Sequence, residues 1–285
     1  MCHNEIKSLR AKGYSYSEIS KKVDKSVKFV YYIAKNVKFS KKGKKRYYSM
    51  VKGILSQIKP QKSFLTPAKI RIIGHLLFDG TVYKLGYSSI MKYINSSKAL
   101  INQFTKDVKE VYGINPSAFE TLDGVKMACY KVHFSSKKMY EDLIKYFSSY
   151  SSKKNIKIPN LIMKANDNLK IEFLRTFWED EGSISQNGRI TADLKNENII
   201  KSLIKLHREF GLNFKLIQYK VYTGKMYKIY LLKNEKNLER FYNLGLFEKS
   251  IITHGLNVGK TKKDVLKTQL EKLKKHKNLT RLKRP

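Results

Sequence analysis

The sequence predicts an α+β fold: two similar halves, each of the order αββαββα and related by a pseudo-twofold axis, preceded by a small all-α module. The first observation is a pair of helix patterns, 66–79 and 167–181, that both end in an acidic residue followed by glycine. The second is that the same succession of strands and helices follows each of them. The third is a group of short capped helical segments over residues 5–36, ahead of both halves.

Residues 1–37 are expected to form a DNA-binding module of three short helices. Ser15 with Glu18 three residues later is a capping-box pattern, which opens the second helix. Helix, tight turn and helix together make the helix-turn-helix arrangement, in which the later helix enters the major groove. The segment LRAKGYSYSEISKKVDKS resembles the helix-turn-helix segment of many resolvases and regulators. A plain three-helix interaction module is the alternative.

The third helix of this module is the one expected to contact DNA. Asp24 and Ser26 are its candidate caps. Its apolar face is expected to hold Val27, Val30 and Ile33. Its exposed face would present Lys25, Lys28, Tyr31, Tyr32 and Lys35. This mixture of positive charge and aromatic rings favours DNA as the partner.

Two basic stretches flank the duplicated region. Residues 38–63 contain no acidic residue, and they are expected to be a linker that can also follow DNA phosphates. The candidate phosphate contacts in this linker are Lys41, Lys42, Lys44, Lys45 and Arg46. Residues 259–285 form the second basic stretch, expected to be a frayed or partly helical tail.

The two halves are expected to span residues 64–158 and 159–258. Thr66-Pro67 is a cap and first-turn signal for the first motif helix, and Asp167 is the expected cap of the second. The later landmarks also match: short alternating segments at 81–94 and 183–194, amphipathic helices ending at Tyr112-Gly113 and Phe210-Gly211, strands at 130–134 and 227–231, and a closing helix in each half. This agreement predicts an internal duplication.

The charge of the chain points to a polyanionic partner. Lys and Arg number 59 against 23 Asp and Glu, which gives a formal net charge of +36. A folded chain tolerates such self-repulsion when a polyanion shares its surface. No apolar run approaches the roughly 18–20 residues that span a bilayer, and Cys2 and Cys129 form neither a zinc cluster nor a disulfide framework. An intracellular protein, cytoplasmic and associated with the nucleoid, is expected.

The acids Asp79 and Glu181 are the candidate catalytic pair. A carboxylate at a helix C-terminus faces the negative end of the helix dipole, at a cost of about 0.3–1 kcal/mol. If the two motif helices pack side by side on the pseudo-dyad, their ends meet and the two carboxylates repel each other. A bound Mg²⁺ would resolve this conflict and could stabilise the attacking and leaving oxygens of a phosphodiester. The predicted metal-site residues are Asp79, Gly80, Glu181 and Gly182.

The same segments resemble a known family. IIGHLLFDG (72–80) and FLRTFWEDEG (173–182) resemble the two motifs of single-chain, archaeal-like LAGLIDADG homing endonucleases, over about residues 64–255. The resemblance implies a saddle of two four-stranded sheets on double-stranded DNA, with the motif helices at the centre. It also implies a monomer that cuts a long target site with Mg²⁺, for which Mn²⁺ substitutes, and gives the metal-binding role to Asp79 and Glu181.

The chain departs from the family pattern at the helix interface. The family places small residues where the motif helices touch; Gly74 conforms, but its counterpart is Thr176. Phe78 and Asp180 stand where Ala or Gly is usual, and their bulk is expected to widen the helix pair. His75, inside an apolar helix, is expected to serve in packing.

Basic and polar residues are expected around the acids and on the sheets. The family carries a lysine near each metal, and the positions that match are Lys153, Lys154 and Lys249; Lys131 and Lys228, equivalent in the two halves, are the alternative. One face of each sheet is expected to read base edges in the major groove. The candidates are Tyr83, Lys84, Tyr87, Lys92, Tyr93 and Lys131 in the first half, and Ser185, Gln186, Arg189, Thr191, Gln218, Lys220, Tyr222 and Lys228 in the second.

These observations together predict a site-specific double-stranded DNA endonuclease. Two alternatives remain open. One is a DNA-binding regulator that kept the saddle and lost cleavage, which the helix-turn-helix makes reasonable. The other is a maturase that binds its own intron RNA, although the helix-turn-helix favours duplex DNA.

Overall fold

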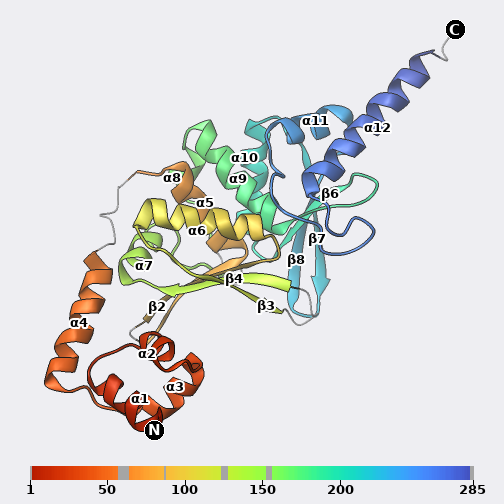
Figure 1. The fold of residues 1–285 in the computed structure, drawn as a ribbon. Helices are drawn as coiled ribbons and strands as arrows, with labels where there is room; N and C mark the ends of the chain where they lie inside the picture. The colour runs from red at the N-terminus through yellow and green to blue at the C-terminus, as the bar shows by residue number, and fades with distance from the viewer. Residues whose placement is uncertain (1, 57–63, 87, 123–127, 152–155, 283–285) are drawn as a thin grey trace. The chain divides into compact units, whose positions relative to one another are not determined.

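The computed structural model describes residues 2–56, 64–86, 88–122, 128–151 and 156–282 (Figure 1). The chain divides into two compact units, Met1–Lys59 and Pro60–Pro285. The first is all helical, and the second carries both sheets.

The first unit contains the helices α1 (Cys2–Ala11), α2 (Tyr16–Val23), α3 (Val27–Ala34) and α4 (Lys41–Ser56). Its small core is formed by Ile6, Ile19, Val30 and Ala34. The capping box at the start of α2 is present, because the Glu18 amide donates to Ser15 Oγ (3.2 Å) and the Ser15 amide donates to the Glu18 carboxylate (2.7 Å).

Three details of this unit differ from the sequence expectations. Asp24 does not cap α3; it ends α2 in the left-handed conformation, with φ 48°, and Ser26 alone caps α3. Val27 is 48% exposed and lies outside the core. Much of the basic stretch expected as a linker is helical, as α4. Gly43 of α4 has no side chain, which lets its backbone lie against Gly13 after α1.

The first half of the second unit follows the predicted order. It contains α5 (Pro67–Phe78), β1 (Gly80–Leu85), β2 (Ser88–Asn95), α6 (Lys98–Tyr112), β3 (Ala118–Leu122), β4 (Ala128–Ser135) and α7 (Lys137–Leu143). The strands form an antiparallel sheet of order β1-β2-β4-β3. α6 and α7 pack on one face of this sheet (Figure 1).

The second half repeats this arrangement after the short helix α8 (Asn160–Met163). It contains α9 (Asp167–Glu181), β5 (Gly182–Ile184), β6 (Ile190–Leu194), α10 (Glu197–Glu209), β7 (Phe214–Val221), β8 (Gly224–Leu231) and α11 (Glu235–Asn243). Its sheet has the equivalent order β5-β6-β8-β7. The α+β fold with two duplicated four-stranded sheets is therefore confirmed. Asn166 rather than Asp167 caps α9, since its side chain accepts from the Leu169 amide.

The motif helices α5 and α9 pack against each other between the two sheets. A Cβ on Gly74 would overlap Thr176 Oγ1, so the helices touch at this glycine and its pseudo-equivalent threonine. Phe78 lies in the interface against Phe173 and Phe177, with ring centroids 5.6 and 5.2 Å apart. At this position, where the family pattern has a small residue, the Phe78 ring packs against other aromatic rings.

Beyond α11 the chain forms an irregular segment and then α12 (Lys262–Leu282). Val265, Leu266 and Leu270 of α12 are buried in the main hydrophobic core, and the helix packs on α11 and β5. The first turns of the expected basic tail are therefore an integral part of the second half. Across the described ranges, no helix combines the length and the apolar character needed to cross a membrane.

Candidate active site

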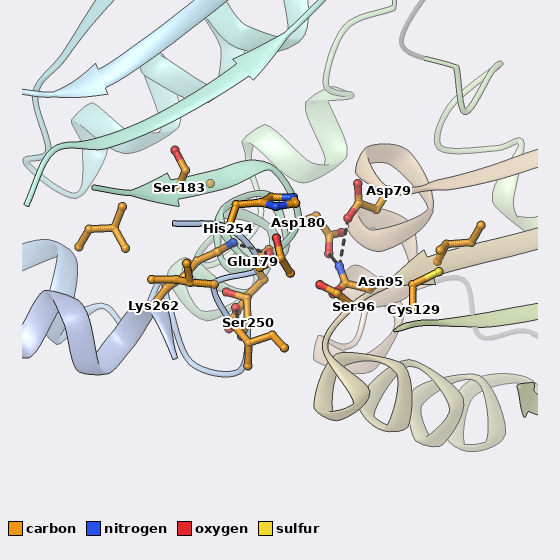
Figure 2. A pocket seen from close by; sticks show the side chains of 16 residues that line it. Asp79, Asn95, Ser96, Cys129, Glu179, Asp180, Ser183, Ser250, His254 and Lys262 are labelled. Carbon is orange, nitrogen blue, oxygen red and sulfur yellow. Dashed lines mark hydrogen bonds between the residues drawn. The ribbon is translucent and has the colours of Figure 1, made fainter. Parts of the chain in front are cut away.

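The two motif acids lie where α5 and α9 end. Asp79 caps the C-terminus of α5, and its amide donates to the His75 carbonyl (3.2 Å); Glu181 is the last residue of α9. A cavity of about 460 Å³ opens at these helix ends. Asp79 and Asp180 line it, and we call it the acid cavity. Figure 2 shows Asp79 and Asn95 on one side of this cavity and Lys262 on the other, with Glu179 and Asp180 between them in this view.

Asp180 is held in place by groups of the first half. Its buried carboxylate contacts His75 Nδ1 (2.9 Å) and accepts hydrogen bonds from Tyr93 Oη (2.9 Å) and Asn95 Nδ2 (3.3 Å). Asn95 Nδ2 also donates to the Asp79 carboxylate (3.0 Å). One amide therefore bridges an acid of each half. His75 packs in the interior as expected, with its ring centroid 4.9 Å from that of Tyr93, and its ring also joins the two motif helices through Asp180.

The motif acids lie in surroundings that disfavour their charged forms. Asp79 is an exposed residue and Glu181 a half-buried one, and other acids lie close to both carboxylates at the crowded helix ends. Burial, then the charges of Asp180 and Glu181, raise the pKa of Asp79 to about 9. Burial, then the charge of Asp180, raise the pKa of Glu181 to about 8. At neutral pH both carboxyls therefore favour the protonated form unless additional positive charge lies beside them.

This donor set is suited to a hard divalent cation. Among the described residues, no three His, Cys, Asp and Glu side chains are grouped so that they could hold a metal ion. Mg²⁺, however, commonly takes one or two protein carboxylates, together with waters and the phosphates of its substrate. Two crowded carboxylates such as Asp79 and Glu181 fit that mode of binding.

Each motif glycine allows a strand to begin directly after its helix. A Cβ on Gly80 would lie 2.6 Å from the Leu76 Cα, and a Cβ on Gly182 would overlap the Trp178 carbonyl oxygen. Larger residues would push the strand away from the helix end and move the acid with it. The role of these glycines as metal-site residues remains a prediction.

Glu179 is a structural anchor that the sequence did not reveal. Its carboxylate accepts backbone hydrogen bonds from Glu248 (2.6 Å), Lys249 (2.7 Å) and Ser250 (2.7 Å). Its main-chain carbonyl accepts a hydrogen bond from Lys262 Nζ (3.0 Å). Glu179 therefore fixes both ends of the segment 251–261, part of which lines the cavity.

The lysines proposed from the family pattern have different surroundings. Lys249 Nζ donates to Gln103 Oε1 (2.6 Å), in a separate pocket with Arg71 and Arg175, and Lys249 does not line the acid cavity. Lys153 and Lys154 lie outside the described residues. Lys262 lines the acid cavity instead; its place in a basic run was the only sign of it in the sequence.

Strand register assigns the first-half candidates to faces. Thr81 pairs with Lys92, Lys92 with His133, and Ile94 with Lys131. Because side chains alternate along a strand, Tyr83, Lys92 and Lys131 share the face opposite to the buried Tyr93, Met91 and Val132. Lys84 lies on the helix-covered side, with its Nζ 5.1 Å from the Tyr140 ring centre. Tyr87 lies outside the described residues.

The second sheet divides its candidates in the same way. Thr191 and Lys228 lie on the open face, where Lys228 Nζ is 3.4 Å from Asp193. Gln218 pairs with Tyr227 and Lys220 with Lys225, which places both on the opposite face. The remaining candidates lie in or beside the two hairpin turns: Ser185, Gln186 and Arg189 between β5 and β6, and the fully exposed Tyr222 between β7 and β8.

The candidates of the first unit lie on its surface. Lys25, Lys28, Tyr31, Tyr32 and Lys35 are exposed on or beside α3, and Lys41, Lys42, Lys44, Lys45 and Arg46 are exposed on α4. Arg46 also pairs with Glu18 (3.1 Å) and lies 3.6 Å from the Tyr14 ring centre. This arginine therefore has a structural role within the unit.

Comparison with known proteins gives distant similarities. No protein-family model matches the chain. An uncharacterised protein of Methanocaldococcus jannaschii is 25% identical over 285 residues, covering 96% of this chain and 94% of that protein. Among solved structures, the homing endonuclease I-DmoI in complex with DNA and Mn has a TM-score of 0.49 at 16% identity, covering 63% of this chain and 96% of that one.

Two further structures show similarity at the same level. The homing endonuclease I-WcaI bound to its DNA recognition sequence has a TM-score of 0.48 at 18% identity, covering 68% of this chain and 86% of that one. Full-length DUF199/WhiA from Thermatoga maritima has a TM-score of 0.46 at 13% identity, covering 76% and 63%. The α+β fold with its two four-stranded antiparallel sheets is established by the strand pairing within this chain and does not depend on these similarities.

Proposed function

We propose that this protein is a site-specific double-stranded DNA endonuclease of the LAGLIDADG homing type, which hydrolyses phosphodiester bonds with Mg²⁺. The observation that carries the proposal is the position of Asp79 and Glu181. They end two pseudo-equivalent, directly packed helices between two equivalent sheets. Each half supplies one acid, which suits a site in which each half cuts one strand of the duplex.

Asp79 and Glu181 would hold the cation. Mg²⁺, when bound, supplies positive charge that stabilises the phosphate oxygens as charge develops on them. The chain's own residues orient the acids: Asn95 Nδ2 fixes the Asp79 carboxylate, and Gly80 and Gly182 keep both acids at the helix ends.

DNA is the proposed partner on the open faces of the two sheets. Tyr83, Lys92 and Lys131 on one sheet, with Thr191 and Lys228 on the other, would contact bases and phosphates. A net charge of +36 supplies the general attraction to the duplex. The helices α2 and α3 would contact a flanking part of a long target as a helix-turn-helix, with the protein acting as a monomer.

A DNA-binding regulator without cleavage is the second candidate. The observation that favours it is the exposed basic and aromatic surface of α3, which is suited to binding an operator. Such a protein would bind duplex DNA specifically and leave it intact with every divalent cation.

A release-by-cleavage selection separates these two functions and works with an unknown target sequence. A randomised duplex pool is immobilised at one end and bound by the protein in Ca²⁺; after washing, Mg²⁺ is added and the released fragments are sequenced. The endonuclease proposal expects enriched fragments with a common end. Specific retention of DNA with no release by Mg²⁺ or Mn²⁺ would support the regulator instead.

Variants of the two acids then test the site. Asp79→Asn and Glu181→Gln should each abolish release and keep binding in Ca²⁺. Asp167→Asn is the matched control, because it removes one carboxylate from the exposed start of the same helix that ends at Glu181. Release by both acid variants at the wild-type rate would show that the acids are not the catalytic pair.

A further inference from the structure

The acid cavity contains a lysine to which the proposed function gives no role. Lys262, the first residue of α12, is 8% exposed, and its Nζ donates to the Glu179 carbonyl at 3.0 Å. It lines the same cavity as Asp79 and Asp180, opposite to Asp79 in Figure 2. A lysine is rarely buried in a protein unless it is paired with acidic groups.

The groups around Lys262 explain why an ammonium is stable there. Glu179, Asp180 and Glu181 are consecutive acids in the last turn of α9, which is the negative end of the helix dipole. Burial lowers the pKa of Lys262, while the charges of these three acids and of Asp79 oppose that shift. The Phe247 ring centre lies 5.4 Å from Nζ and adds a cation–π contact.

The four acids differ in the hydrogen bonds that their carboxylates accept. The Glu179 carboxylate is bound by backbone amides, and that of Asp180 by His75, Tyr93 and Asn95. The Asp79 carboxylate accepts a hydrogen bond from the Asn95 side-chain amide. Among the described contacts, none is a hydrogen bond to the Glu181 carboxylate. Lys262 is the one lysine or arginine among the described residues that line this cavity.

We propose that Lys262 is a built-in counter-cation of the acid cavity, which competes with divalent cations for the acids that end α5 and α9. The inference rests on the proposed function in taking Asp79 and Glu181 as the cation-binding acids. Lys262 thereby lowers the affinity of the DNA-free protein for Mg²⁺ and Mn²⁺. DNA phosphates, which add negative charge and oxygen ligands, would then be needed for strong cation binding.

Substitution can remove the positive charge of Lys262 and keep a hydrogen bond to the Glu179 main-chain carbonyl. Lys262→Gln retains a donor for the Glu179 carbonyl, Lys262→Met removes both charge and donor, and Lys262→Arg retains the charge. Lys263→Met is the matched control: it removes the same charge from the neighbouring residue, whose Nζ pairs with Glu248 (2.8 Å). A purely structural cap would change stability in these variants without changing cation affinity.

The measurement is Mn²⁺ binding to the full-length protein without DNA, followed by electron paramagnetic resonance and calorimetry. Lys262→Gln should bind Mn²⁺ on the order of tenfold more tightly than wild type, because one like charge has left the cavity. Lys262→Arg and Lys263→Met should match wild type. The gain should disappear when Asp79→Asn and Glu181→Gln are added. If Lys262→Met does not fold, the Gln and Arg variants still give this comparison.

Two results would overturn the inference. One is equal Mn²⁺ affinity in Lys262→Gln, Lys263→Met and wild type. The other is a gain in affinity that persists after both acids are neutralised, which would place the bound cation elsewhere. Cleavage of selected DNA is measured separately. A protein that cuts DNA but shows no gain refutes only the role of Lys262, and one that shows the gain but never cuts refutes only the endonuclease.

Discussion

Glu179→Ala should release the segment that closes one side of the acid cavity. The Glu179 carboxylate accepts the backbone amides of Glu248, Lys249 and Ser250 at 2.6–2.7 Å, and the glutamate is 2% exposed. A hydrogen bond to a charged group contributes about 1.5–3 kcal/mol, and bonds to one carboxylate are not additive. We therefore expect the local opening free energy to fall by about 3 kcal/mol, which corresponds to roughly hundredfold faster amide exchange.

Hydrogen–deuterium exchange measured by mass spectrometry on peptides covering 246–262 tests this expectation. Protection should fall at 248–250, while peptides from α6 and α10 should keep their protection. Asp167→Ala is the control, since this residue also belongs to α9 but its side chain is 80% exposed. Wild-type protection at 248–250 in Glu179→Ala would refute the claim that this carboxylate anchors the segment.

Three further predictions follow from the acids, the sheet faces and the helix interface. In the folded state the pKa of Asp79 is raised to about 9 and that of Glu181 to about 8, so the folded protein binds these protons more tightly than the unfolded chain. Without divalent cations, thermal stability should therefore fall as pH rises from about 5 to about 9; neutralising both acids should flatten this slope, and an unchanged slope would contradict the assignment. Lys92→Ala should weaken DNA binding and reduce the salt dependence by about one phosphate contact, whereas Lys84→Ala, on the opposite face, should leave both unchanged in filter binding. Gly74→Ala should destabilise the second unit by about 1–3 kcal/mol in urea unfolding, because the added methyl overlaps the facing helix; an unchanged midpoint would show that the helices can separate at no cost.

The sequence was sufficient for the order of elements and for the position of the motif acids. Both depend on local signals: caps, helical periodicity and a spacing repeated in two halves. The acid pair Asp79 and Glu181 lies at helix ends as predicted, because the glycine that follows each acid permits the turn into a strand.

The contacts that the sequence did not reveal are long-range or depend on strand register. His75 and Asp180 are 105 residues apart, and no local pattern pairs them. Lys84 and Lys92 look equivalent as basic strand residues, yet register places them on opposite faces. Lys262 belongs to a basic run that would ordinarily be solvated, and only the docking of α12 places it in the cavity.

The docking of α12 has a consequence for the order in which the protein matures on the ribosome. Glu181 is synthesised 81 residues before Lys262 (262 − 181). While that stretch is being translated, the newly made acids have neither this ammonium nor the segment 248–250 that Glu179 holds. The nascent chain therefore gains a complete cavity only after the first turns of α12 have left the exit tunnel, so the nuclease proposed above could not act on DNA before that helix has been made.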